Sequence, residues 1–118
     1  MGKAIGLVEY RTVSTGISAA DIMLKTAEVS VIEAHPVCPG KYIILVTGGL
    51  SAVQSSVEAA KTNFSEMLVD SFVLGNPHDS IFSAIYGASE VGDVEALGII
   101  ETFSVASTIV AADAAAKT

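Results

Sequence analysis

The chain has 118 residues, of which 51% are hydrophobic and 16% are charged, and its six basic and 13 acidic side chains give a formal net charge of −7. This composition predicts one folded domain rather than a disordered segment, and the negative charge argues against nucleic acid as a partner. No apolar run is long enough to span a bilayer, so we expect no membrane partner; a single cysteine and the absence of a signal-peptide pattern predict a cytoplasmic protein.

The first part of the chain predicts a strand, a helix and a second strand. Residues 4–11 are rich in β-forming side chains, and Ser18 can cap a helix over roughly 19–27. The next strand is expected over 29–37, with all its odd positions on one side. It ends at the turn Cys38-Pro39-Gly40.

Further along, residues 42–46 form a continuous apolar run that predicts a central strand. Apolar residues at alternating spacings of four and three predict an amphipathic helix over about 50–67. A fourth strand over 69–74 and a short helix over 79–86 follow. The order β-α-β-β-α-β predicts the ferredoxin-like α+β arrangement, which by itself decides no function because it carries many.

The end of the chain repeats its beginning. Residues 96–118 align with residues 4–26 without a gap, and 10 of the 23 positions are identical. Self-similarity at a fixed interval, here 92 residues, indicates a duplicated unit. We therefore predict a complete domain over 1–88, a linker over 89–95 and a truncated β-α start of a second domain over 96–118. Because a lone strand and helix leave a free edge, we expect this tail to be disordered or docked by exchange with a neighbouring subunit.

Five segments in register resemble the shell proteins of bacterial microcompartments. They are AIGLVEYRTV, AADIMLKTAEV, VCPGKY, TGGLSAVQSSVEAA and VLGNPHDSIFSAI, and the repeat matches the opening a second time. The resemblance implies a structural tile that catalyses no reaction and assembles with itself and with other shell proteins. One subclass fuses two such domains, and three chains form a pseudo-hexameric homotrimer; the repeat indicates this subclass.

The same resemblance places the turn in the pore loop of the tile, with Val37, Pro39 and Gly40 lining it. Cys38 matches the cysteine with which propanediol-type tandem shell proteins hold an iron–sulfur cluster on the threefold axis. A chain with one cysteine can surround a cluster only if copies meet at a symmetry axis. We therefore expect one [4Fe–4S] cluster per trimer, bound through Cys38, for electron transfer or cluster transport across the shell, with encapsulated redox enzymes as possible partners. Two alternatives stay open: a structural cysteine, and a plain metabolite pore.

Other candidate residues are weaker. His35 with Cys38 from three copies could form a zinc site, but their opposite parity on the strand argues against convergence. Lys25 and Lys117 match the lysine at the edge between tiles. His78 is expected at a turn or subunit edge rather than in acid–base catalysis.

No residue is predicted to be catalytic. Glu9 and Glu101 occupy equivalent positions in the two units, so they are interpreted as structural polar contacts. Gly48-Gly49 lacks the Lys-Ser/Thr pair of a phosphate-binding loop, so it is interpreted as a turn. An enzyme or small-molecule sensor on the ferredoxin-like scaffold is the alternative from a different functional class.

Overall fold

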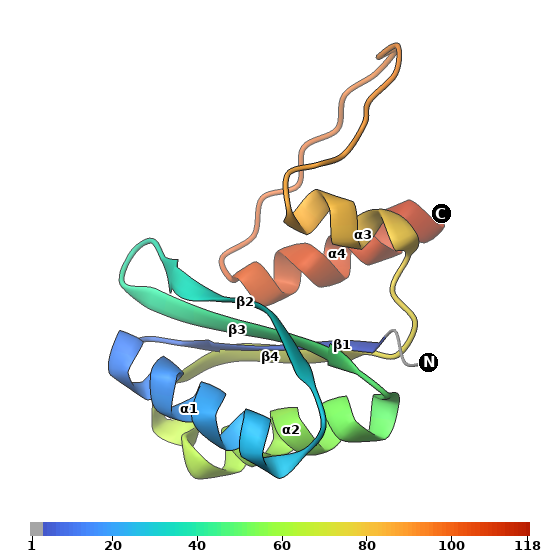
Figure 1. Ribbon diagram of the computed structural model, residues 1–118. Helices are drawn as coiled ribbons and strands as arrows, with labels where there is room; N and C mark the ends of the chain where they lie inside the picture. The colour runs from blue at the N-terminus through green and yellow to red at the C-terminus, as the bar shows by residue number, and fades with distance from the viewer. Residues whose placement is uncertain (1–3) are drawn as a thin grey trace.

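A computed structural model describes residues 4–118. Four antiparallel strands form one sheet in the order β2-β3-β1-β4. Helices cover both faces of this sheet (Figure 1), with α1 and α2 on one side and α3 and α4 on the other. The elements are β1 (Ala4–Tyr10), α1 (Val13–Thr26), β2 (Ser30–Val37), β3 (Lys41–Gly48), α2 (Leu50–Asn63), a 3-10 turn (Ser65–Met67), β4 (Leu68–Leu74), α3 (Asp79–Ile85) and α4 (Val105–Lys117). The predicted α+β class and its element order are confirmed.

The core consists of two apolar layers, one on each side of the sheet. Every residue of the central strand β1 is buried. Val8 and Val46 pack toward α1 and α2, whereas Leu7 and Leu45 pack toward α3 and α4. Since both faces of the central strands are covered, their sequences are continuously apolar rather than alternating.

Helix α1 begins at Val13, earlier than the sequence predicted. Thr12 caps it, with its hydroxyl accepting a hydrogen bond from the Thr15 N–H at 3.4 Å. Ser18, the expected cap, therefore lies inside the helix. Gly16 explains the close seating of α1, because a Cβ at this position would lie 2.3 Å from Cδ2 of Tyr42.

Strand β2 contains an irregularity that the sequence pattern did not predict. Its register with β3 shifts between Val31 and Glu33. Glu33 and His35 consequently face α3 and α4, while Val29 packs on the opposite side of the sheet. The expectation that all odd positions share one side was wrong, because one extra residue reverses the alternation.

The repeated segment at the end of the chain forms a helix but no strand. Residues 96–103 lie in a long loop that extends away from the body of the domain (Figure 1). Leu97 and Ile99 are 80% and 83% exposed, whereas their counterparts Ile5 and Leu7 in β1 are fully buried. In the sheet, β1 is central and pairs with β3 on one side and β4 on the other. Within residues 4–118 there is no second pair of strands between which a copy of β1 could be placed.

Helix α4 packs against β1, β4 and α3 of its own chain. The expectation that the tail is disordered was therefore wrong for this helix, whereas exchange with a neighbouring subunit stays a prediction. Helix α4 docks there because it covers the second apolar face of the sheet and removes that face from water. Within residues 4–118, no helix is both long and apolar enough to cross a bilayer.

Candidate functional site

The turn between β2 and β3 presents Cys38 at its tip. The side chain is exposed, and its thiol is free. The Cys38–Pro39 peptide bond is cis, and Gly40 has a φ of 80°, in the left-handed region that favours glycine. Val37 is the half-buried last residue of β2. The turn therefore leaves its thiol accessible to solvent, beyond the last residue of β2.

Cys38 and Pro39 line a surface hollow of about 810 Å3. Its other walls come from the ends of β1 and β3, from β4 and from the start of α4: Arg11, Lys41, Val69, Asp70, Thr102, Phe103, Ser104 and Ser107. Across residues 4–118, no three histidine, cysteine, aspartate or glutamate side chains come together as a metal-binding group. One chain thus offers a single accessible thiol, and a metal cluster at Cys38 requires ligands from other copies.

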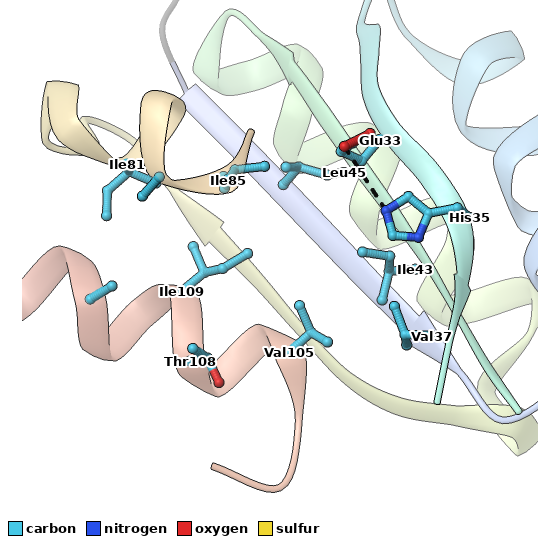
Figure 2. Close-up of a pocket in the computed structure, with 12 residues that line it drawn as sticks. Glu33, His35, Val37, Ile43, Leu45, Ile81, Ile85, Val105, Thr108 and Ile109 are labelled. Carbon is cyan, nitrogen blue, oxygen red and sulfur yellow. Dashed lines mark ion pairs between the residues drawn. The ribbon is translucent and has the colours of Figure 1, made fainter. Parts of the chain in front are cut away.

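His35 lies apart from this hollow. It lines a different pocket of about 330 Å3 between the sheet and the helices α3 and α4 (Figure 2), where its Nε2 is 4.0 Å from Oε1 of Glu33. The other lining residues are mostly apolar, among them Ile43, Ile81 and Ile109. The structure does not bring His35 and Cys38 into one site, which removes the geometric basis for a zinc centre within the chain.

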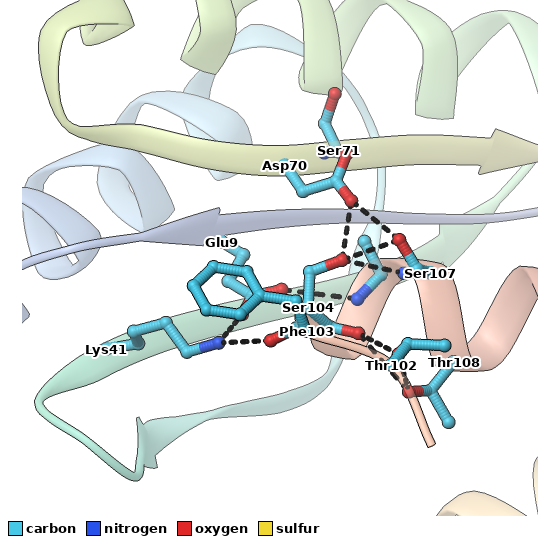
Figure 3. Close-up of polar contacts among 10 residues, drawn as sticks. Glu9, Lys41, Asp70, Ser71, Thr102, Phe103, Ser104, Ser107 and Thr108 are labelled. Carbon is cyan, nitrogen blue, oxygen red and sulfur yellow. Dashed lines mark hydrogen bonds and ion pairs between the residues drawn. The ribbon is translucent and has the colours of Figure 1, made fainter. Parts of the chain in front are cut away.

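Lys41, which lines the Cys38 hollow, belongs to a buried ion pair with Glu9 (Figure 3). Lys41 Nζ is 2.6 Å from Oε2 of Glu9, a side chain with no exposed surface. Lys41 also donates to the Phe103 carbonyl at 3.2 Å, and its Nζ lies 5.4 Å from the centre of the Phe103 ring. The other Glu9 oxygen accepts from the Ala106 N–H at 3.2 Å. Glu9 therefore binds the open N-terminus of α4, where a negative charge is favourable.

Asp70 holds the same end of α4. Its Oδ2 accepts hydrogen bonds from the hydroxyls of Ser104 at 2.6 Å and Ser107 at 3.1 Å. Burial would raise the pKa of Asp70, but the hydrogen bonds from Ser104, Ser71 and Ser107 outweigh it and lower the pKa below its ordinary value. Sequence reasoning missed Asp70, since nothing in the repeat or in its neighbourhood marks it.

The middle of α4 is held through Asp113. Its Oδ1 accepts from the His78 N–H at 2.7 Å, and its Oδ2 is 2.8 Å from Lys117 Nζ. Burial acts to raise the pKa of Asp113, yet the contacts with Lys117 and His78 lower it overall. The His78 ring caps α3, with Nδ1 accepting from the Ser80 N–H at 3.1 Å. His78 thus has a structural part at the junction of α3 and α4.

Lys25 lies far from these contacts, on the exposed surface of α1. Its Nζ is 2.9 Å from Oδ2 of Asp21, one helical turn earlier. This pair repeats the one between Lys117 and Asp113, but both of its side chains are mostly exposed.

Comparison with known families identifies the domain. The BMC domain model matches residues 4–77. The chain belongs to the BMC domain family. This BMC domain holds β1 to β4 and the turn with Cys38, while α3 and α4 lie beyond the matched range.

Individual relatives are shell proteins. The chain is 42% identical over 117 residues to the bacterial microcompartment shell protein PduT of Citrobacter freundii, a match that covers 99% of this chain and 64% of the relative. It is 34% identical over 95 residues to the carboxysome shell protein CsoS1 of Prochlorococcus marinus strain SARG, covering 78% of this chain and 92% of that one.

Among solved structures, a microcompartments protein from Desulfitobacterium hafniense DCB superposes with a TM-score of 0.85 and 54% identity. That match covers 100% of this chain and 66% of the other. The chain therefore spans about two thirds of the length of PduT and of the Desulfitobacterium protein.

Proposed function

We propose that this chain is a structural shell protein of a bacterial microcompartment, built from tandem BMC domains that assemble as a pseudo-hexameric homotrimer and tile the shell without catalysing a reaction. Membership of the BMC family carries the proposal, and the 42% identity with the shell protein PduT supports it. The repeat of residues 4–26 in residues 96–118 supports the tandem arrangement, with one domain over 1–88, a linker over 89–95 and the start of another from 96 onward. Other shell proteins are the natural partners.

We assign Cys38 as the residue with which each of three copies ligates a shared [4Fe–4S] cluster. Its exposure at the tip of a turn supports this assignment, as does the lack of any other thiol in the chain. Such a cluster supplies one-electron redox chemistry when bound. The chain itself contributes the thiolate, while Val37, Pro39 and Gly40 shape the loop that lines the pore.

At the rim of the tile, we assign Lys25, Lys117 and His78 to contacts between neighbouring tiles. The side chain of Lys25 is 75% exposed, so its long aliphatic stem is available to pack against an adjacent tile. Lys117 is 46% exposed and shares the same helical position in the repeat.

The test compares the chain with Cys38→Ser, both purified without oxygen and analysed for iron, sulfide and assembly. We expect about four irons per three chains in the unaltered protein and none in the variant, because one thiolate from each copy ligates the cluster. Rings and sheets, observed by electron microscopy, should be the same for both.

Other outcomes point to the alternatives. Rings or sheets that contain no iron would favour a tile with a plain metabolite pore. Binding of a small molecule in the pocket of about 330 Å3, with neither rings nor sheets, would favour the sensor.

A further inference from the structure

The pocket of about 330 Å3 between the sheet and the helices α3 and α4 has a mostly apolar interior (Figure 2). Ile43 and Leu45 of β3 line it on the sheet side, and Ile81 of α3 and Ile109 of α4 line it on the helix side. Its volume falls within the range of small-molecule sites, roughly 300–1,000 Å3, and an apolar interior is typical of them. The pocket therefore has both the size and the lining to hold an aliphatic group.

The polar groups of this pocket lie on strand β2, where the shift in register turns Glu33 and His35 toward α3 and α4. These two are the only titratable side chains among the residues that line it. The side chains of Glu33 and His35 are 29% and 44% exposed, which places them at the mouth of the pocket. The hydroxyl of Thr108, also in the lining, already donates to the Ser104 carbonyl at 3.2 Å. The polar end of the pocket is thus the Glu33–His35 pair.

Both side chains of this pair present hydrogen-bond acceptors to each other. Nδ1 of His35 is 3.0 Å from the carbonyl oxygen of Pro36. A carbonyl oxygen only accepts, so this contact assigns the proton of the neutral ring to Nδ1 and leaves Nε2 as an acceptor. Nε2 lies 4.0 Å from Oε1 of Glu33, which is too far for a hydrogen bond. Two acceptors that face each other in this way need a donor between them.

A primary ammonium group fits this requirement. It carries several N–H donors on one nitrogen, so it can donate to Oε1 of Glu33 and to Nε2 of His35 at once, and its positive charge complements the carboxylate. A hydroxyl group has one proton and can donate to only one of the two atoms. A carboxylate has no proton to donate and is repelled by Glu33. The geometry of the pair therefore selects an amine over an alcohol or an acid.

We propose that this pocket binds a primary alkylamine, with its ammonium group between Glu33 and His35 and its aliphatic chain against Ile43, Ile81 and Ile109. The inference goes beyond the proposed tile, because it depends neither on assembly nor on Cys38. A ligand in this position contacts the sheet, α3 and α4 together. Binding thus stabilises the docked position of α4 by mass action.

Three probes with the same chain length and different head groups test the selectivity. The full chain is titrated by calorimetry with n-hexylamine, n-hexanol and hexanoate at about pH 8, where an ordinary imidazole is neutral and an alkylamine is charged. We expect hexylamine to bind about tenfold more tightly than hexanol, because a hydrogen bond to a charged group is worth more than a neutral one. Hexanoate should show no binding. Equal affinities for the three probes, or no saturable binding of hexylamine, would overturn the proposal.

Substitutions at the mouth identify the groups that bind the ammonium. Glu33→Gln keeps the shape of the side chain and removes its charge, so it should lower the affinity for hexylamine to that of hexanol. His35→Phe should also narrow the difference between the two probes. Glu58→Gln is the matched control, since Glu58 is exposed on α2, which covers the opposite face of the sheet, and it should change neither affinity. An affinity for hexylamine that Glu33→Gln leaves unchanged contradicts the assigned site.

The position of the aliphatic chain is measured separately. In NMR spectra of the isoleucine methyl groups, hexylamine should shift the signals of Ile43, Ile81 and Ile109, while Ile22, which packs on the other side of the sheet, should stay unchanged. Shifts confined to Ile22 would place the ligand elsewhere and overturn the proposal. Electron microscopy of the same samples keeps the two proposals apart. Rings without amine binding would leave the tile and remove the pocket, and amine binding without rings would do the reverse.

Discussion

The ammonium group of Lys41 and the buried carboxylate of Glu9, on the adjacent strands β3 and β1, are 2.6 Å apart. The pair connects three parts of the chain, because Glu9 also accepts from the N-terminus of α4 and Lys41 donates to the carbonyl of Phe103. A carboxylate without exposed surface is tolerated only when it is paired and hydrogen-bonded. Docking of α4 and burial of Glu9 therefore support each other.

Removing the ammonium should destabilise the fold more than removing the whole pair. Lys41→Met leaves the Glu9 charge buried, and we expect the free energy of unfolding to fall by about 3 kcal/mol. The double variant Glu9→Gln, Lys41→Met should recover most of this loss, because the amide oxygen can still accept from Ala106. Urea unfolding of the two single variants and the double variant measures the coupling; strictly additive losses would contradict it.

Acid should release α4 before it unfolds the domain. Asp70 and Asp113 bind the start and the middle of this helix, and the pKa of each carboxyl is lowered by its contacts. A carboxyl whose pKa is lower in the folded than in the unfolded state stabilises the fold at pH values above the unfolded-state pKa, near 3.8. This stabilisation is lost as the pH falls through the folded-state pKa. The protection factor of the His78 amide, which compares its exchange rate with the intrinsic rate at the same pH, should therefore fall below about pH 4, before the protection factors of the β1 and β3 amides fall.

The controls for acid release are the amide variants. Asp70→Asn and Asp113→Asn should loosen α4 already at neutral pH and flatten the pH dependence. If the His78 amide exchanged together with the core strands at every pH, α4 would not be a separate unit.

The close approach of α1 to the sheet should make Gly16 intolerant of even one carbon atom. Alanine improves the intrinsic helix propensity by about 1 kcal/mol, but its Cβ would lie 2.3 Å from the ring of Tyr42. We expect the strain to win, with Gly16→Ala lowering the free energy of unfolding by about 1 to 3 kcal/mol. Gly92→Ala is the matched control, since no atom lies within 4 Å of a Cβ there. Equal stability of the two variants in thermal unfolding would show that α1 can move away from Tyr42 without a loss in the free energy of unfolding.

The sequence predicted a helix or strand correctly where the pattern of apolar residues alone determined it. Continuous apolar runs marked the central strands, and the spacing of apolar residues marked α2, although its last turn forms a separate 3-10 turn at Ser65–Met67. The prediction was wrong at the start of α1, where Thr12 and not Ser18 caps the helix, and where Gly16, in the added first turn, packs against Tyr42 from another strand. It was also wrong at the irregularity in β2, which depends on pairing with β3.

The amino-acid sequence by itself determined that the opening unit occurs twice, that the chain has a shell-protein pattern, and that a single thiol stands in a turn. These features depend on residue identity and spacing along the chain. Only the tertiary structure decided that α4 seats on the second face of the sheet, that Asp70 and the His78 amide hold it there, and that α1 leaves the equivalent face open. Which face of two similar helices becomes buried depends on the surfaces that other segments present, and that information is not local in the sequence.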